Sequence, residues 1–296
     1  MVLGYIGFGE AAFEMSTGLK GEGLKDIVAF DSMVDHPIFG AQIKNRAASS
    51  EVELLASAAE VIAASDLVMV AVPASVTLST CETVIEYFRP KQLYVDLTAA
   101  SPSVKKAAAA LASKQGADFA DVAIMAVVRK FKHKVPILAS GSGAYRLFET
   151  MSPYGMQIEI VGEEPGAASG IKLVRSLCMK GMAAVVMETL EAAVTLGIAD
   201  RVVPGICKTL EECTFEQTLD RLSVGTALHA ARRAAELAGC MEMLRDTGID
   251  STIVEAAFKK HELIAKLNLN EHFAGKPPQV WSEVIETIVK KIAGNC

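Results

Sequence analysis

The sequence has little that would tie the protein to metals, disulfides or membranes. No apolar run reaches the roughly 18 residues that a transmembrane helix requires, and no positively charged leader precedes the first apolar segment, so we expect a cytoplasmic protein without a membrane span. The cysteines form no Cys-x-x-Cys pair and lie mostly in apolar runs, which predicts reduced thiols. They are Cys81, Cys178, Cys207, Cys213, Cys240 and Cys296.

Metal chemistry and nucleic-acid binding are equally poorly supported. The histidines have no His-x-His or His-x-x-x-His spacing, so we expect no metal site. Lys and Arg number 29 against 35 Asp and Glu, a net charge of -6, which leaves no basic field to attract a phosphate backbone. The histidines are His36, His133, His229, His261 and His272.

What the chain does have is enough apolar material for a large core. Of its 296 residues, 51% are hydrophobic and 22% are charged, which predicts two folded domains and excludes a disordered chain. The mean hydropathy of +0.32 is high for a soluble monomer. We therefore expect apolar helix faces to be buried between subunits, in a homodimer at least.

A glycine-rich turn follows the first apolar strand, residues 2–6, and leads into a helix that extends to about residue 19. The pattern is Gly-x-Gly-x-x-Ala. Gly7 allows a tight turn, Gly9 lets a pyrophosphate approach the backbone, and the small Ala12 lets helix and strand pack closely. The free N–H groups at the helix start would hold the anion. The sequence thus predicts a dinucleotide site at Gly7, Phe8, Gly9, Glu10, Ala11 and Ala12.

A carboxylate ends the second predicted strand, residues 26–31, at the offset expected for such a site. Asp31 would accept hydrogen bonds from the adenosine ribose and repel a 2′-phosphate, which favours NAD over NADP. Between residues 32 and 50 only Lys44 and Arg46 could receive a 2′-phosphate. The alternative is that Asp31 is an ordinary turn residue after a strand.

The next segments continue the alternation of helix and strand. We expect a helix over 51–64, a buried strand over 66–73 that brings Val72 and Pro73 to the cofactor, a helix over 75–88 and a strand over 93–96. Thr98 follows that last strand, where ligands bind in such folds, and we assign it to both cofactor and substrate. Ser101-Pro102 would also serve simply to start the helix at 103–114.

Three more strands, at 119–124, 135–139 and 157–161, complete an N-terminal doubly wound sheet of the Rossmann type. From Pro165 onward we expect only helices, so the fold class is α/β with an all-α C-terminal domain. The predicted domains are 1–162 and 163–296. The predicted helices are 165–196, 200–207, 213–239 with a break near Gly225, 241–246, 251–266 and 279–292.

The first of these helices carries an unexpected polar stripe. At about 100° per residue, Ser169, Lys172 and Ser176 lie on one side of an otherwise apolar helix. A lysine in apolar surroundings costs free energy unless it is paired or lines a cleft, and its pKa can fall towards the range of a general base. Lys172 is therefore our candidate for the chemical centre. The alternative is that it extends to solvent from a half-exposed helix.

These motifs together resemble the β-hydroxyacid dehydrogenase family, the relatives of 3-hydroxyisobutyrate and 6-phosphogluconate dehydrogenase, in a branch with a shorter helical domain. The glycine loop resembles the family's cofactor loop, and residues 96–102 resemble its D-x-S-T-x-x-P segment. Gly170, Lys172 and Ser176 resemble the G-x-x-x-K-x-x-x-N helix. The resemblance implies that Lys172 is the catalytic acid and base, with Ser176 in the place of the asparagine.

The substrate half departs from the family pattern. The loop usually written D-x-P-V-S-G-G appears here as Asp121-Val-Ala-Ile-Met125-Ala126-Val127, which lacks the donors that would grip a carboxylate. Met125 and Ala126 are our candidate substrate contacts, and the bulk of Met125 and Val127 indicates a more apolar or differently shaped substrate.

The function these features predict is hydride transfer between NAD and a small 3-hydroxy acid or related alcohol. Arg232 and Arg233 are candidates for binding its acid group, although they could equally form a solvated face paired with Glu236. Two alternatives stay open. One is NADH-dependent imine reduction on the same scaffold, and the other is a non-catalytic NAD-binding sensor.

Overall fold

The computed structural model describes residues 1–274 and 276–294; Cys296 lies outside the described residues. The chain divides into two compact units, Met1–Leu177 and Cys178–Cys296. The strands of the described part all lie in the first unit, and its remainder is helical, which confirms the predicted α/β class with a helical C-terminal region. The domain boundary expected between residues 162 and 163 stays a prediction.

The first unit is built on one twisted sheet of mostly parallel strands, in the order β3-β2-β1-β4-β5-β6-β7-β8. The order from β3 to β6 is that of the Rossmann fold, and β7 pairs antiparallel with β6 before β8 pairs parallel with β7. The strands are β1 (Val2–Ile6), β2 (Asp26–Phe30), β3 (Glu53–Leu54), β4 (Leu67–Val70), β5 (Leu93–Asp96), β6 (Asp118–Ile124), β7 (Ile137–Ser140) and β8 (Ile158–Gly162).

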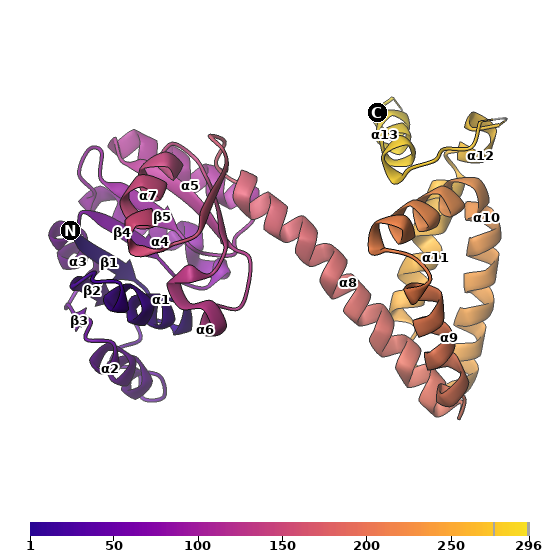
Figure 1. The fold of residues 1–296 in the computed structure, drawn as a ribbon, viewed down its shortest axis with the longest axis horizontal. Coiled ribbons are helices and arrows are strands. Elements are labelled where there is room, and N and C mark those ends of the chain that lie inside the picture. The colour runs from indigo at the N-terminus through magenta and orange to yellow at the C-terminus, as the bar shows by residue number, and fades with distance from the viewer. Residues whose placement is uncertain (275, 295–296) are drawn as a thin grey trace. The chain divides into compact units, whose positions relative to one another are not determined.

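Helices cover both faces of this sheet (Figure 1). On one face Met15 and Leu19 of α1 and Leu147 of α7 join a buried cluster with the strands. On the other, Cys81 of α4 and Ala108 of α5 do the same. Both sides of the strands are thus buried, which explains why the strands are apolar without alternation. The helices are α1 (Glu10–Gly21), α2 (Gly40–Ser49), α3 (Ala58–Ala64), α4 (Thr77–Val84), α5 (Pro102–Gln115), α6 (Val128–Phe131) and α7 (Ala144–Met151).

Within the second unit the helices pack through small apolar clusters, one of which joins Ala192, Leu244 and Val254. Glu188 adds a polar tie, because its two carboxylate oxygens accept hydrogen bonds of 2.9 Å from the N–H groups of Ile253 and Val254 at the start of α11. The helices are α8 (Ala167–Thr195), which crosses from the first unit into the second, α9 (Ala199–Glu211), α10 (Phe215–Thr247), α11 (Thr252–Ala265), α12 (Leu269–His272) and α13 (Trp281–Ala293).

Three predictions about helices were wrong. The helix expected over 51–64 is a short strand, β3, followed by α3, and a further helix, α2, lies at residues where we expected none. The break expected near Gly225 lies instead at His229, whose φ of -132° and ψ of 24° are not helical, and the separate helix expected at 241–246 is part of α10, which continues to Thr247. Glycine lowers helix propensity but does not fix where a helix bends.

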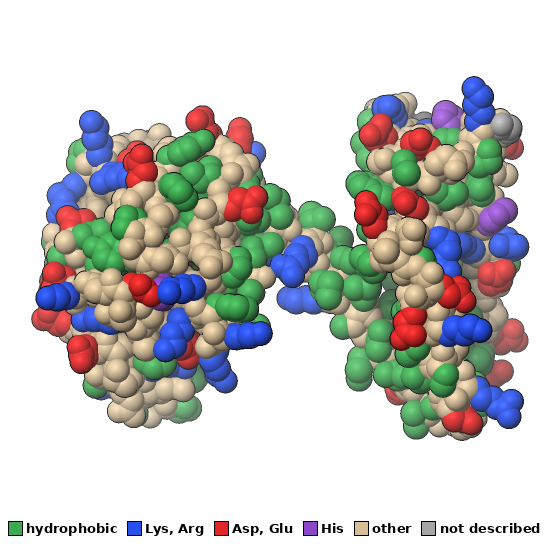
Figure 2. All heavy atoms as spheres, viewed as in Figure 1, with side chains coloured by type: hydrophobic (Ala, Val, Ile, Leu, Met, Phe, Trp, Pro, Cys, Tyr) green, Lys and Arg blue, Asp and Glu red, His purple; other side chains and the backbone are tan. Residues whose placement is uncertain are grey.

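Apolar side chains stand exposed along α8, where Figure 2 shows hydrophobic groups gathered. Val174 is 70% exposed, Leu177 75% and Met187 69%. A monomer seldom leaves so many large apolar residues in water on one helix. In the described part of the chain, no helix combines the length and hydropathy that crossing a bilayer would require.

Candidate active site

Paired residues form one continuous line across the sheet where the parallel strands end, and this line organises the site. Phe30 pairs with Ile6, Ile6 with Val70, Val70 with Asp96, and Asp96 with Asp121. Asp121 then pairs with Ser140 of the antiparallel strand β7. We call these residues the carboxyl-edge row: Phe30, Ile6, Val70, Asp96, Asp121 and Ser140.

The glycine loop leaves the row directly after Ile6. Gly7 has a φ of 87°, and a Cβ there would lie 2.6 Å from the Ala71 carbonyl oxygen, so only glycine allows this turn. A Cβ at Gly9 would instead meet nothing within 4 Å. Gly9 is also the N-cap of α1, and no side chain caps that helix. The free N–H groups at the start of α1 thus face an opening in which an anionic group fits.

The neighbouring loop residues support this turn from the core side. The Phe8 side chain is fully buried and packs edge-on against Tyr5, with ring centroids 6.2 Å apart, so only its backbone can face a ligand. Ala12 is fully buried against the sheet, as its small size predicted. Ala11 is half-buried. Glu10 is exposed and forms an ion pair of 3.1 Å with Arg129 of α6.

Asp31 follows Phe30 in the chain, one residue beyond the row, and braces the glycine loop. Its Oδ2 accepts a hydrogen bond of 2.7 Å from the Phe8 N–H, and its Oδ1 accepts one of 2.9 Å from the Met33 N–H. A carboxylate oxygen has two acceptor positions, so each can take one further donor. The sequence indicated a ligand-binding role for Asp31; this brace is an additional role that spacing alone could not show.

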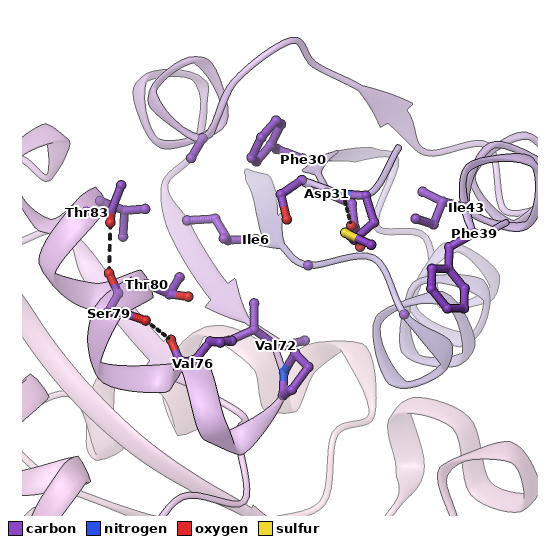
Figure 3. Close-up of a pocket in the computed structure, with 18 of the residues that line it drawn as sticks. Ile6, Phe30, Asp31, Phe39, Ile43, Val72, Val76, Ser79, Thr80 and Thr83 are labelled. Carbon is purple, nitrogen blue, oxygen red and sulfur yellow. Dashed lines mark hydrogen bonds between the residues drawn. The ribbon is translucent and has the colours of Figure 1, made fainter. Parts of the chain in front are cut away.

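A cavity of about 540 Å³ lies beside the loop, between the ends of β1, β2 and β4. In Figure 3 Asp31 borders it on one side, and Val72, Val76 and Thr80 border it on the other. Pro73 and Arg46 also line it. Its position is where the strand order reverses, the point at which doubly wound sheets bind dinucleotides. Loop, helix start, carboxylate and cavity together fit such a cofactor.

Further along the row, three charged side chains form a buried cluster. Lys105 of α5, Asp96 and Asp121 are all 0% exposed. The Lys105 Nζ lies 2.8 Å from Asp96 Oδ1 and 3.2 Å from Asp121 Oδ1, and it also donates to the Asp96 carbonyl oxygen at 3.0 Å. Thr98 lies alongside, with its N–H bound to Asp96 Oδ1 at 2.9 Å. Its buried hydroxyl has no hydrogen-bond partner among the described residues.

Asp121 and its row neighbour Ser140 hold the start of α8. Asp121 Oδ2 accepts hydrogen bonds from the N–H groups of Gly166, at 3.1 Å, and Ser169, at 3.0 Å. The Ser169 hydroxyl donates to Asp121 Oδ1 at 2.5 Å, and Ser140 Oγ accepts from the Ala168 N–H at 3.1 Å. Side chains of the sheet thus bind the N–H groups that a helix start leaves without partners.

The candidate catalytic residues follow on the same helix. Lys172 and Ser176 are half-buried in the first unit. Arg175 is exposed and donates a hydrogen bond of 2.9 Å to the Met125 carbonyl oxygen, which ties α8 to the segment after β6. Met125 is half-buried and Ala126 exposed.

The two arginines proposed for substrate binding lie on α10, in the second unit, and both have partners there. Arg232 forms an ion pair of 3.6 Å with Glu236, and Arg233 donates to the Leu222 carbonyl oxygen at 3.1 Å and to Thr226 Oγ1 at 2.5 Å. Their substrate role stays a prediction. Across residues 1–274 and 276–294, acidic, histidine and cysteine side chains form no group that could hold a metal ion.

Sequence reasoning missed the lysine of the buried cluster. Lys105 lies in a predicted helix whose other lysines are exposed. The hydrophobic period of that helix does not show that Lys105 is buried while its neighbour Lys106 is 60% exposed. The available sign was in the strands: Asp96 and Asp121 are carboxylates within predicted strands of a doubly wound sheet, where helices cover both faces and buried charges need partners.

Comparisons with known proteins agree with this architecture. Residues 3–154 match the family described as the NAD binding domain of 6-phosphogluconate dehydrogenase, and residues 193–264 match a domain of unknown function, DUF1932. A protein of unknown function described as structurally similar to 3-hydroxyacid dehydrogenases is 30% identical, with a TM-score of 0.59 over 89% of this chain and 99% of that one.

Two further solved structures are similar over nearly the whole chain. A conserved hypothetical protein from Sinorhizobium meliloti 1021 is 29% identical, with a TM-score of 0.61 over 94% of this chain and 95% of that one. A reductive aminase from Aspergillus terreus, in complex with NADPH4, cyclohexanone and allyl amine, has a TM-score of 0.72 over 97% of this chain and 99% of that one. At 18% identity this likeness shows the shared fold.

The buried cluster makes a prediction about stability. Lys105→Met leaves two buried carboxylates without their cation, so we expect a loss of about 3–5 kcal/mol in the free energy of unfolding, measured by urea denaturation. Lys106→Met is the matched control, because Lys106 is exposed and pairs with Glu164 at 3.4 Å; it should change stability by less than about 0.5 kcal/mol. Equal effects of the two substitutions would contradict the cluster's role.

Proposed function

This chain belongs to the β-hydroxyacid dehydrogenase family, and on that premise we propose that it transfers a hydride between NAD and a small 3-hydroxy acid or related alcohol. Its NAD(P)-binding domain and dehydrogenase-like or reductase-like character follow from the family. The alcohol substrate, the preference for NAD and the role of Lys172 do not follow from the family, and we propose them here.

The observation that carries the proposal is the carboxyl-edge row. The glycine loop begins after Ile6. Asp121, which accepts hydrogen bonds from the start of α8, lies three strands away on the same row. At about 4.8 Å between neighbouring strands, the two lie roughly 15 Å apart on one edge of the sheet. A dinucleotide whose pyrophosphate lies at Gly9 can extend along this edge towards Thr98 and the helix that carries Lys172.

When bound, the nicotinamide would supply the hydride acceptor or donor. Lys172 would accept the hydroxyl proton during oxidation and return it during reduction. Ser176, one helical turn further on, would hydrogen-bond the substrate oxygen or the Lys172 amine. Thr98 is 3% exposed and its hydroxyl has no hydrogen-bond partner among the described residues; this hydroxyl would bind the cofactor or the substrate where they meet. Arg232 and Arg233 are proposed to bind the acid group.

Imine reduction is the second candidate. The segment after β6 lacks the Ser-Gly-Gly donors and exposes 65% of Val127, which suits a less charged substrate. The two activities separate in one assay: NADH formation from NAD with 3-hydroxypropionate, 3-hydroxybutyrate and 3-hydroxyisobutyrate, against NADH consumption with 1-pyrroline. A sensor would bind NADH, seen as increased nicotinamide fluorescence, and turn over none of them.

The proposed acid and base can be tested by removing its amine. Lys172→Met should lower turnover of the active 3-hydroxy acid by about 10²- to 10⁴-fold, the range for a positioned acid or base, while the Kd for NADH changes less than about twofold. Lys180→Met, eight residues along the same helix and exposed, should cost far less. If Lys172→Met turns over substrate at the wild-type rate, the proton acceptor is another residue.

Cofactor choice is expected to depend on Asp31. The wild type should bind NAD at least about tenfold more tightly than NADP, because the carboxylate meets the 2′-phosphate with like charge. Asp31→Ala should weaken binding of both nucleotides, because the brace on the Phe8 N–H is lost as well. Fluorescence titration measures each Kd, and Asp35→Ala, an exposed carboxylate paired with Lys44, is the control. Equal wild-type affinities would overturn the assignment and would direct attention to Arg46.

The exposed apolar surface of α8 leads us to propose a homodimer. Sedimentation at micromolar concentration should give twice the chain mass of 31.4 kDa. Leu177→Glu, at a position that is 75% exposed, should shift the protein towards the monomer without unfolding it, whereas Lys180→Glu should not. A wild-type chain that sediments as a monomer would contradict this arrangement.

A further inference from the structure

The start of α8 is fixed in the first unit by contacts from three directions. Asp121 and Ser140 bind its first N–H groups from the sheet. Gly166 lies against α5, where a Cβ would come within 2.9 Å of the Pro102 carbonyl oxygen, and its φ of 94° is one that glycine adopts without strain. Ala168 is 0% exposed and packs with Ala123 and Leu138. The first turn of α8 therefore has little freedom to slide or rotate.

The rotation of this first turn sets the direction of Lys172. Ser169 and Lys172 are three residues apart, so they lie about 60° apart on one side of the helix, separated by about 4.5 Å along its axis. Ser169 gives both its N–H and its hydroxyl to Asp121. A rotation of the first turn about the helix axis would break both hydrogen bonds and move Lys172 with it.

The carboxylate that makes these bonds is itself held in place. Asp121 Oδ1 faces the Lys105 ammonium at 3.2 Å, and the same ammonium is bound to Asp96. With two carboxylates and one ammonium, the buried cluster has an excess negative charge, which the N–H donors and the positive end of the helix dipole of α8 offset. Electrostatics thus favour keeping the start of α8 on Asp121 over any arrangement that withdraws it.

We propose that Asp121, oriented by Lys105 and Asp96, is a positioning residue that holds Lys172 at the reacting edge of the sheet. This inference rests on the proposed role of Lys172. The position of Lys172 then depends on a buried ion cluster on β5, β6 and α5. Ser169 transmits the constraint from Asp121 to Lys172. Asp121 does not itself touch the substrate, so its loss should affect the chemical step more than substrate or cofactor binding.

The test compares Asp121→Asn and Ser169→Ala with Asp118→Asn in the full-length chain. Asp118 is on the same strand but partly exposed, where it pairs with Arg146 at 3.2 Å. Ser169→Ala leaves all three cluster charges in place and so provides a variant that folds if Asp121→Asn does not. For each variant, turnover of whichever of the three 3-hydroxy acids is active gives kcat and KM, and NADH fluorescence gives the cofactor Kd.

We expect Asp121→Asn to lower kcat at least about tenfold, and Ser169→Ala to lower it about threefold. In both variants KM and the NADH Kd should stay within about twofold of wild type. Hydrogen exchange of the amides from 168 to 172 should accelerate in both variants, while exchange in β1 and β4 stays as in wild type. Asp118→Asn should change none of these values.

Two results would overturn the positioning role. One is wild-type kcat in Asp121→Asn or Ser169→Ala despite faster exchange at 168–172. The other is a fall in kcat with exchange faster throughout the first unit, which is a general loss of stability. The proposed function fails separately: if Lys172→Met keeps its turnover, Lys172 is not the acid and base, and if the wild type oxidises none of the three acids, the proposed substrate class is wrong, whatever the exchange data show for α8.

Discussion

An ammonium group shared by two buried carboxylates joins α5, two strands of the sheet and the start of α8. Lys105 comes from α5, and Asp96 and Asp121 come from adjacent strands. Through Asp121 the same cluster reaches the N–H groups at the start of α8. Burying three charges costs free energy, and replacing such a group with apolar residues often stabilises a protein. The role we propose for it is to specify one position for the start of α8.

The edge of the sheet then explains why cofactor and lysine sites belong together. Parallel strands all end on the same side, so the loops after β1, β2, β4 and β5 open towards one crevice. The sheet sets the spacing between the glycine loop and the start of α8. The short loops after the strands carry the candidate ligand-binding residues. The segment after β6, which carries Met125 and Val127, lies beyond the carboxyl-edge row.

The cofactor half could be predicted from sequence because its constraints are local. Gly7 is required by a φ of 87° and a neighbouring carbonyl, and the short spacing to Asp31 follows from one helix and one strand. The buried cluster could not be predicted, because Lys105 and Asp121 meet only through the topology of the sheet. The helix α2 was missed because Gly40, Ile43 and Ala47 are its only buried residues, too few apolar side chains to mark a helical period. The kink at His229 has no sequence sign that we can identify.

The most direct test of the account is a crystal structure of the chain with NADH bound. The account predicts the pyrophosphate at the start of α1 beside Gly9, the adenosine ribose at Asp31, and the nicotinamide near Thr98 with its reacting face towards Lys172. A nicotinamide directed away from the Asp96–Asp121 end of the row, with Lys172 of each copy of the chain remote from it, would contradict the account.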